Sequence, residues 1–150
     1  MPRMPTRDRI TRILTTSVSA LLLLALSTTT ASALEWDQAR VTQLAGELQN
    51  GLVALLHDPG LAPEQMTSMQ DRKHAAAVAN LKALERTAVQ LIELLREGRD
   101  RGVTEPLFDR MREQIATVRE FAEDSTIGES AAQHATRVTK SFAKLRLYYS

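Results

Sequence analysis

The chain has 150 residues, of which 43% are hydrophobic and 4% aromatic, with a formal net charge of +1 and no cysteine. This length is typical of one domain. Without cysteine, disulfide scaffolds and thiolate chemistry are excluded. The low aromatic content disfavours a sheet-based fold, because aromatic residues are enriched in strands.

The first 33 residues have the three-part pattern of a secretory signal peptide. Four arginines and one aspartate precede a short apolar stretch at residues 13–26, and Ala31, Ser32 and Ala33 form an A-x-A site. These parts, in this order, are typical of signal peptides. We therefore expect cleavage after Ala33, with Ala31 as the neighbouring option, and export to the periplasm of a bacterium or secretion otherwise.

An uncleaved membrane anchor is the alternative interpretation of this segment. Its apolar stretch is shorter than the roughly 20 residues that span a bilayer, so no stable membrane span is expected in the exported protein. Without residues 1–33, the chain keeps 15 Lys and Arg and 17 Asp and Glu, a formal net charge of −2. A nucleic-acid partner is not expected, because it requires a basic face.

Apolar residues recur at helical spacing through residues 34–150, which we expect to form one domain. The predicted helices cover residues 36–56, 63–98, 104–124 and 129–149. Pro59 ends the first helix, Pro63 lies in the first turn of the second, and Thr104 caps the third. The predicted inward stripes are Val41, Leu44, Leu48, Leu52 and Leu55; Leu81, Leu84, Ala88, Leu91 and Leu95; Leu107, Met111, Ile115, Val118 and Ala122 or Phe121; and Ala131, Ala135, Val138, Phe142, Leu145 and Tyr149.

Four amphipathic helices with short connections predict an all-α fold, an antiparallel four-helix bundle. The alternative is a pair of helical hairpins that completes its core by forming a homodimer. Residues 68–74 are polar. They indicate either a break in the second helix or an overhang exposed to solvent, and the continuity of that helix stays open.

The motifs of common enzymes are missing from the sequence. It contains no c-type haem attachment motif, no His-Glu-x-x-His, no glycine-rich phosphate loop and no Gly-x-Ser-x-Gly. Asp71 and His74 supply only one half-motif of a di-iron carboxylate site. We therefore expect a non-catalytic accessory module that binds an envelope or secreted protein and needs no cofactor. An enzyme would need catalytic residues from a partner or a cofactor.

The alternative function is a metal- or haem-binding bundle. Its candidate ligands are His57, His74, His134, Met66 and Met69. In an up-and-down bundle, the helical rise brings His57 and His74 to similar heights, with His134 about two turns below. Imidazole and thioether ligands suit copper, and a His–Met or His–His pair suits a b-type haem. In the competing interpretation, His57 meets the negative end of a helix dipole, the other histidines are solvated and the methionines fill the core.

Two segments are candidates for partner binding. Arg99 and Arg101 lie in a loop region of mixed charge, which either docks an acidic partner or forms an ordinary solvated end of the bundle. Leu147 or Tyr148 must point away from the inward stripe of the last helix. This apolar excess either packs under Trp36 or forms a patch for a partner.

Overall fold

The structure is a computed structural model that describes residues 34–62, 67–124 and 126–150. The predicted signal peptide and Met66 lie outside these ranges. Within them the chain is all-helical, with no strand, which confirms that the fold is all-α. Its elements are α1 (Gln38–Leu56), the short 3-10 helix η1 (Pro59–Leu61), α2 (Ser68–Arg96), α3 (Arg101–Glu123) and α4 (Glu129–Tyr149). Among these residues, no helix has both the length and the apolar character needed to cross a membrane.

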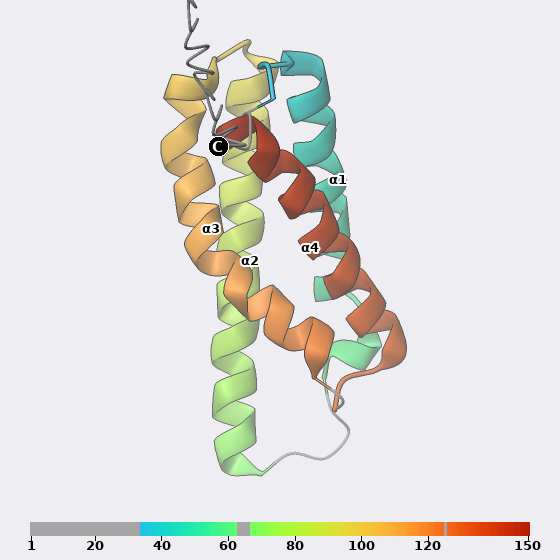
Figure 1. Ribbon diagram of the computed structural model, residues 1–150. Helices are drawn as coiled ribbons and strands as arrows, with labels where there is room; N and C mark the ends of the chain where they lie inside the picture. Colours follow the sequence, from blue (N-terminus) through green and yellow to red (C-terminus); the bar gives the residue numbers. More distant parts are fainter. Residues whose placement is uncertain (1–33, 63–66, 125) are drawn as a thin grey trace, which may run out of the picture. The chain divides into compact units, whose positions relative to one another are not determined.

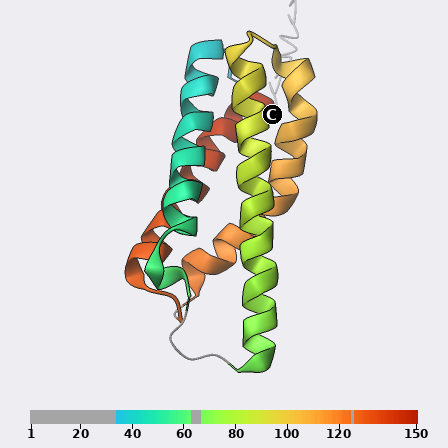
Figure 2. The same ribbon diagram turned by 180° about the vertical axis from the view of Figure 1, so that it is seen from behind.

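The four helices pack side by side (Figures 1 and 2). Helix α1 contacts α2 and α4, and α3 contacts the same two helices. The beginning of α1 lies beside the end of α2, where Gln38 Nε2 donates a hydrogen bond to the carbonyl oxygen of Leu95 at 2.6 Å. The beginning of α4 lies beside the end of α1, where the Ser130 hydroxyl donates to Asp58 Oδ1 at 3.0 Å.

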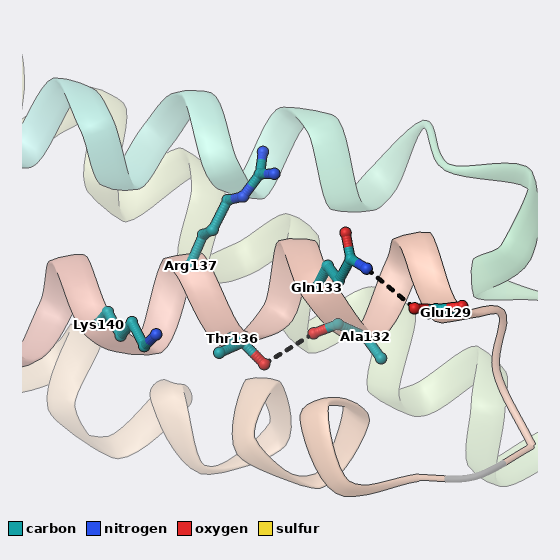
Figure 3. Close-up of a pocket in the computed structure, with 6 residues that line it drawn as sticks. All are labelled: Glu129, Ala132, Gln133, Thr136, Arg137 and Lys140. Atoms are coloured by element: carbon teal, nitrogen blue, oxygen red, sulfur yellow. Dashed lines mark hydrogen bonds between the residues drawn. The ribbon is translucent and has the colours of Figure 1, made fainter.

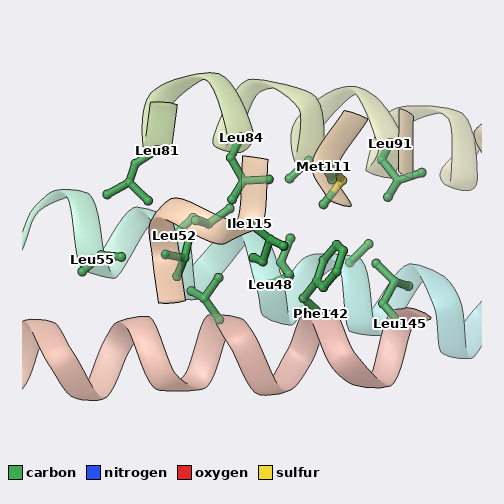
Figure 4. Close-up of a cluster of buried hydrophobic side chains, with 14 of the residues drawn as sticks. Leu48, Leu52, Leu55, Leu81, Leu84, Leu91, Met111, Ile115, Phe142 and Leu145 are labelled. Atoms are coloured by element: carbon green, nitrogen blue, oxygen red, sulfur yellow. The ribbon is translucent and has the colours of Figure 1, made fainter. Parts of the chain in front are cut away.

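All four helices contribute side chains to one hydrophobic core (Figure 4). The predicted stripes of α1, α2 and α4 are buried throughout, which confirms the helical spacing. In α3 the predicted stripe is wrong in one place, because Phe108 is buried and Leu107 is only partly buried. At the other end of this stripe, where the prediction left Ala122 and Phe121 open, Phe121 is the buried residue. Burial of each leucine or phenylalanine side chain contributes about 1.5–3 kcal/mol.

Helix α2 begins five residues later than predicted, at Ser68 instead of residue 63. Thr67 has an extended backbone and forms a capping box with Gln70, which fixes the start of the helix. The helix is continuous from there to Arg96, so residues 68–74 contain no break. Its first turns are exposed and extend beyond the neighbouring helices (Figure 1), as the overhang interpretation predicted.

Helix α3 begins at Arg101, three residues before the predicted start, and Thr104 is not its cap. Gly98 has a positive φ of 76° and ends α2 in a Schellman motif, in which the Arg99 N–H donates to Leu94. The Asp100 carboxylate then accepts from the N–H of Val103 at 3.1 Å and caps α3. Thr104 is buried inside the first turns.

Helices α1 and α4 approach each other closely at Gly51. A Cβ atom built on this glycine would lie 2.8 Å from Val138 Cγ2, closer than real side chains come. Any larger residue at position 51 would therefore force Val138 or the helices to shift. At Gly46, one and a half turns earlier on α1, a Cβ atom would have no neighbour within 4 Å.

Candidate partner-binding surface

Four aromatic rings form a cluster at the end of the bundle where α4 finishes. The cluster consists of Trp36, Phe108, Phe142 and Tyr149. Phe108 stacks on Phe142, with ring centroids 5.1 Å apart, and on Tyr149, with centroids 4.2 Å apart. Trp36 meets Tyr149 edge-on at 5.4 Å. Because the rings come from α3, α4 and the segment before α1, the aromatic cluster packs these three parts of the chain together.

Tyr149 is fixed by its hydroxyl group as well as by its ring. The hydroxyl donates a buried hydrogen bond to Thr104 Oγ1 at 2.8 Å. Thr104 Oγ1 donates in turn to the carbonyl oxygen of Asp100 at 3.0 Å. Burial raises the pKa of Tyr149 to about 12, even though the bond to Thr104 and the nearby Arg101 favour the phenolate. The ring is therefore neutral at physiological pH.

Trp36 is held against the bundle by a chain of hydrogen bonds. Its indole Nε1 donates to Gln38 Oε1 at 2.8 Å, and Gln38 Nε2 donates to Leu95 at the end of α2. The sequence analysis expected the apolar excess at Leu147 or Tyr148 either to pack under Trp36 or to form a patch. Leu147 is exposed, and Tyr148 is partly buried against the core. The ring that packs on Trp36 is that of Tyr149, from the inward stripe.

Trp36 also belongs to an apolar surface at this end of the bundle, which we call the α1/α4 patch. It consists of Leu34, Trp36, Leu147 and Tyr148. Leu34 and Leu147 are 46% and 47% exposed, and the N–H of Leu34 donates to the carbonyl oxygen of Leu147 at 3.0 Å. An open depression of about 610 Å³ adjoins the patch. It is lined by Leu34, Glu35, Trp36, Asp37, Gln38, Ala39 and Tyr148.

The rim of this depression is acidic. Glu35 and Asp37 are both exposed there. One Asp37 oxygen, Oδ1, accepts from the N–H of Arg40 at 2.9 Å and caps α1. The depression thus combines apolar walls from Leu34, Trp36 and Tyr148 with negative charge beside them, a combination that suits an apolar side chain flanked by basic residues.

The two candidate arginines already contact groups of the protein itself. Arg101 Nη2 donates to the carbonyl oxygens of Tyr149 and Ser150 at 3.0 and 3.1 Å, where a cation is favoured by the dipole of α4. Arg99 Nε lies 3.4 Å from Glu97 Oε2 in an exposed pair, a type that contributes little. Arg101 therefore caps the carbonyl end of α4. Its position in the sequence does not indicate this role.

The three candidate metal-binding histidines have separate neighbours. His57 Nδ1 lies 2.8 Å from the carbonyl oxygen of Val53 at the end of α1, and His74 meets Phe121 edge-on at 5.9 Å. His134 Nε2 lies 3.6 Å from Asp58 Oδ2. Met69 is 67% exposed, so the interpretation that it fills the core is wrong.

Within the described ranges, no three His, Asp or Glu side chains are grouped to hold a metal ion. Met66 lies outside those ranges. The copper and b-type haem sites stay predictions.

Asp58, Ser130 and His134 lie together where the beginning of α4 packs beside the end of α1. The Asp58 side chain is only 7% exposed, and it accepts from the Gly60 N–H at 2.7 Å and from the Ser130 hydroxyl at 3.0 Å. A serine nucleophile is activated by a hydrogen bond to histidine. Here Ser130 donates to the carboxylate instead, so the cluster fastens two elements and does not form a catalytic triad.

A second depression, of about 350 Å³, follows the outer face of α4 (Figure 3). Its lining residues are Glu129, Ala132, Gln133, Thr136, Arg137 and Lys140. Two of the polar side chains bond within the helix, since Gln133 donates to Glu129 at 3.2 Å and Thr136 donates to Ala132 at 2.9 Å. This face has the mixed polar character of a solvated helix surface and lacks large apolar side chains, unlike the α1/α4 patch.

Comparisons with protein-family models, with curated proteins and with solved structures find no match for this chain. The choice between these surfaces therefore depends on their own chemistry. Of the two depressions, the one beside the α1/α4 patch combines apolar walls with charge.

Proposed function

We propose that the protein is an exported antiparallel helical bundle that acts without catalysis, by binding another protein at the α1/α4 patch. The observation that carries this proposal is the exposure of Leu34 and Leu147 at the same end of the bundle as the depression that Leu34, Trp36 and Tyr148 line. Contiguous exposed apolar groups mark interaction sites, whereas single scattered ones are normal. The signal-peptide pattern of residues 1–33 supports export.

The antiparallel arrangement in this proposal is supported by hydrogen bonds between opposite ends of helices. Gln38 at the start of α1 bonds Leu95 at the end of α2, and Arg101 at the start of α3 bonds Tyr149 at the end of α4. Short connections between neighbouring helices favour the same arrangement.

The proposed partner is a protein segment with one aliphatic or aromatic anchor flanked by lysine or arginine. The anchor enters the depression beside Trp36 and Tyr148, and the basic residues face Glu35 and Asp37. Apolar anchors of this kind supply most of the energy in protein interfaces, while charges at the rim mainly add specificity and association rate.

Replacement of Leu147 by aspartate tests the surface. The exported protein is captured after chemical crosslinking in cells, and bound proteins are compared for the wild type, Leu147→Asp and the control Val53→Asp. Val53 is also an exposed apolar residue, but it lies near the other end of α1. We expect Leu147→Asp to reduce the capture of one partner at least about tenfold and Val53→Asp to retain it, because a carboxylate would replace an apolar contact of the interface. Equal capture by both variants contradicts the proposal.

A further inference from the structure

The backbone nitrogen of Leu34 lies at the end of α4, where carbonyl groups need donors. The last four carbonyls of a helix have no partner within the helix. In α4, Arg101 donates a hydrogen bond to the carbonyl oxygen of Tyr149, and the Ser150 hydroxyl donates to that of Arg146. The Leu34 N–H donates to the carbonyl oxygen of Leu147 at 3.0 Å. Leu34 is thus one of the donors to three of the last four carbonyls of α4.

Leu34 is also the residue that directly follows the A-x-A site. Residues 34–37 are outside any helix, and Leu34, Glu35 and Asp37 are exposed. The chain on the carboxyl side of the Ala33–Leu34 bond is therefore exposed and outside the helices.

We propose that cleavage after Ala33 creates a charged cap for α4. Hydrolysis adds water across the Ala33–Leu34 amide bond, which leaves a carboxylate on Ala33 and an amine on Leu34 that takes up a proton. The resulting ammonium group stays on the carbonyl oxygen of Leu147. Processing therefore strengthens the contact that joins the start of the exported chain to α4. This inference rests on the export part of the proposed function.

Two physical effects make the ammonium a stronger cap than the amide. The end of α4 has a partial negative charge from the helix dipole, so a positive charge is favoured there. A hydrogen bond from a charged donor is also stronger than one from a neutral amide. Glu35 and Asp37 follow Leu34 on its own segment, and Arg146 precedes Leu147 on α4. Arg101 Nη2 donates to the Tyr149 carbonyl at the same helix end. An α-amino group titrates at about pH 8.

The test exports the full chain with its own N-terminal segment and compares it with a variant that has one alanine inserted between Ala33 and Leu34. After cleavage the variant carries the same net charge, but its ammonium is one residue further from Leu147. We expect an intact mass that begins at Leu34 for the wild type. At pH 6.5 the wild type should have a folding equilibrium constant about two- to fivefold larger than the variant.

This advantage should disappear as the pH rises towards 9.5. A cap that favours the ammonium raises the pKa of the folded amine, so its stabilisation is present below the unfolded pKa and is lost as the pH passes the folded pKa. Acetylation of Leu34 in the purified wild type removes the charge without lengthening the chain. It should abolish the loss of stability between pH 6.5 and 9.5.

The possible outcomes separate the two parts of the inference. A mass that begins elsewhere contradicts cleavage at this bond and with it the charged cap. A different result is a mass that shows a chain beginning at Leu34, with the same dependence of stability on pH for the wild type, the variant and the acetylated protein. That result contradicts the charged cap and leaves the export proposal intact.

Discussion

The hydroxyl group of Tyr149 donates a hydrogen bond to Thr104 Oγ1 at 2.8 Å, in the interior of the bundle. This bond connects the last turn of α4 to the first turns of α3. It also positions the Tyr149 ring between Phe108 and Trp36, which is one residue of the α1/α4 patch.

Tyr149→Phe should lower the free energy of unfolding by about 1 kcal/mol, because it removes one buried hydrogen bond and keeps the ring. Thr104 still donates to Asp100 in this variant, which limits the loss. Chemical denaturation at neutral pH measures the difference. Tyr149→Ala serves as the comparison, and its loss should be several times larger because the aromatic stacking disappears too. A Tyr149→Phe loss as large as that of the alanine variant would contradict this account.

The same tyrosine should make the protein sensitive to strong alkali. Burial raises the pKa of Tyr149 to about 12 from its ordinary value of 10, so the unfolded chain loses this proton first. The corresponding stability is complete below pH 10 and is lost as the pH rises through about 12. Thermal unfolding between pH 9 and 12 should show a shallower decline for Tyr149→Phe than for the wild type, and identical slopes would show that the side chain is not buried.

Two glycines on α1 provide a matched pair. Gly46→Ala should stabilise the protein by up to about 1 kcal/mol, because alanine is the better helix former and its Cβ has no neighbour within 4 Å. Gly51→Ala has the same gain in propensity, but its Cβ would lie 2.8 Å from Val138 Cγ2, and such overpacking costs about 1–3 kcal/mol. Melting temperatures should move in opposite directions. A stabilised Gly51→Ala variant would show that α1 and α4 do not cross closely there.

Asp58→Ala should destabilise the junction of α1 and α4 by about 1–2 kcal/mol, since the Gly60 N–H and the Ser130 hydroxyl lose their acceptor. Asp58→Asn keeps a side-chain oxygen at this position and is the control. Hydrogen exchange of the backbone amides around residues 58–61 and 128–131 measures the local effect. Equal protection in both variants would mean that the carboxylate does not fasten these elements.

The buried stripes could be predicted because helical spacing fixes which residues share a face. Helix ends were harder to place, since the choice between two possible caps depends on the preceding backbone. Thr104 has the right chemistry for a cap, but the positive φ of Gly98 turns the chain early and lets Asp100 cap α3 instead. Thr67 similarly competes with Pro63 and begins α2 later.

The candidate site was predicted only in part. Leu147 and Tyr148 were identified because they break the stripe of α4, whereas Phe108 was missed because the stripe of α3 was assigned to Leu107. The contact of Arg101 with the end of α4 connects residues 48 positions apart, so no local sequence pattern could predict it. The helical rise predicted the heights of the histidines, but it does not specify their neighbours across helices.

The central claim is that another protein binds at the α1/α4 patch. The most direct measurement places a photo-crosslinking amino acid at Leu147 in the exported full chain and, separately, at Val53. The account predicts a discrete adduct of one size from Leu147 after irradiation in cells, and none from Val53. The absence of any adduct at Leu147, or the same adducts from both positions, would contradict it.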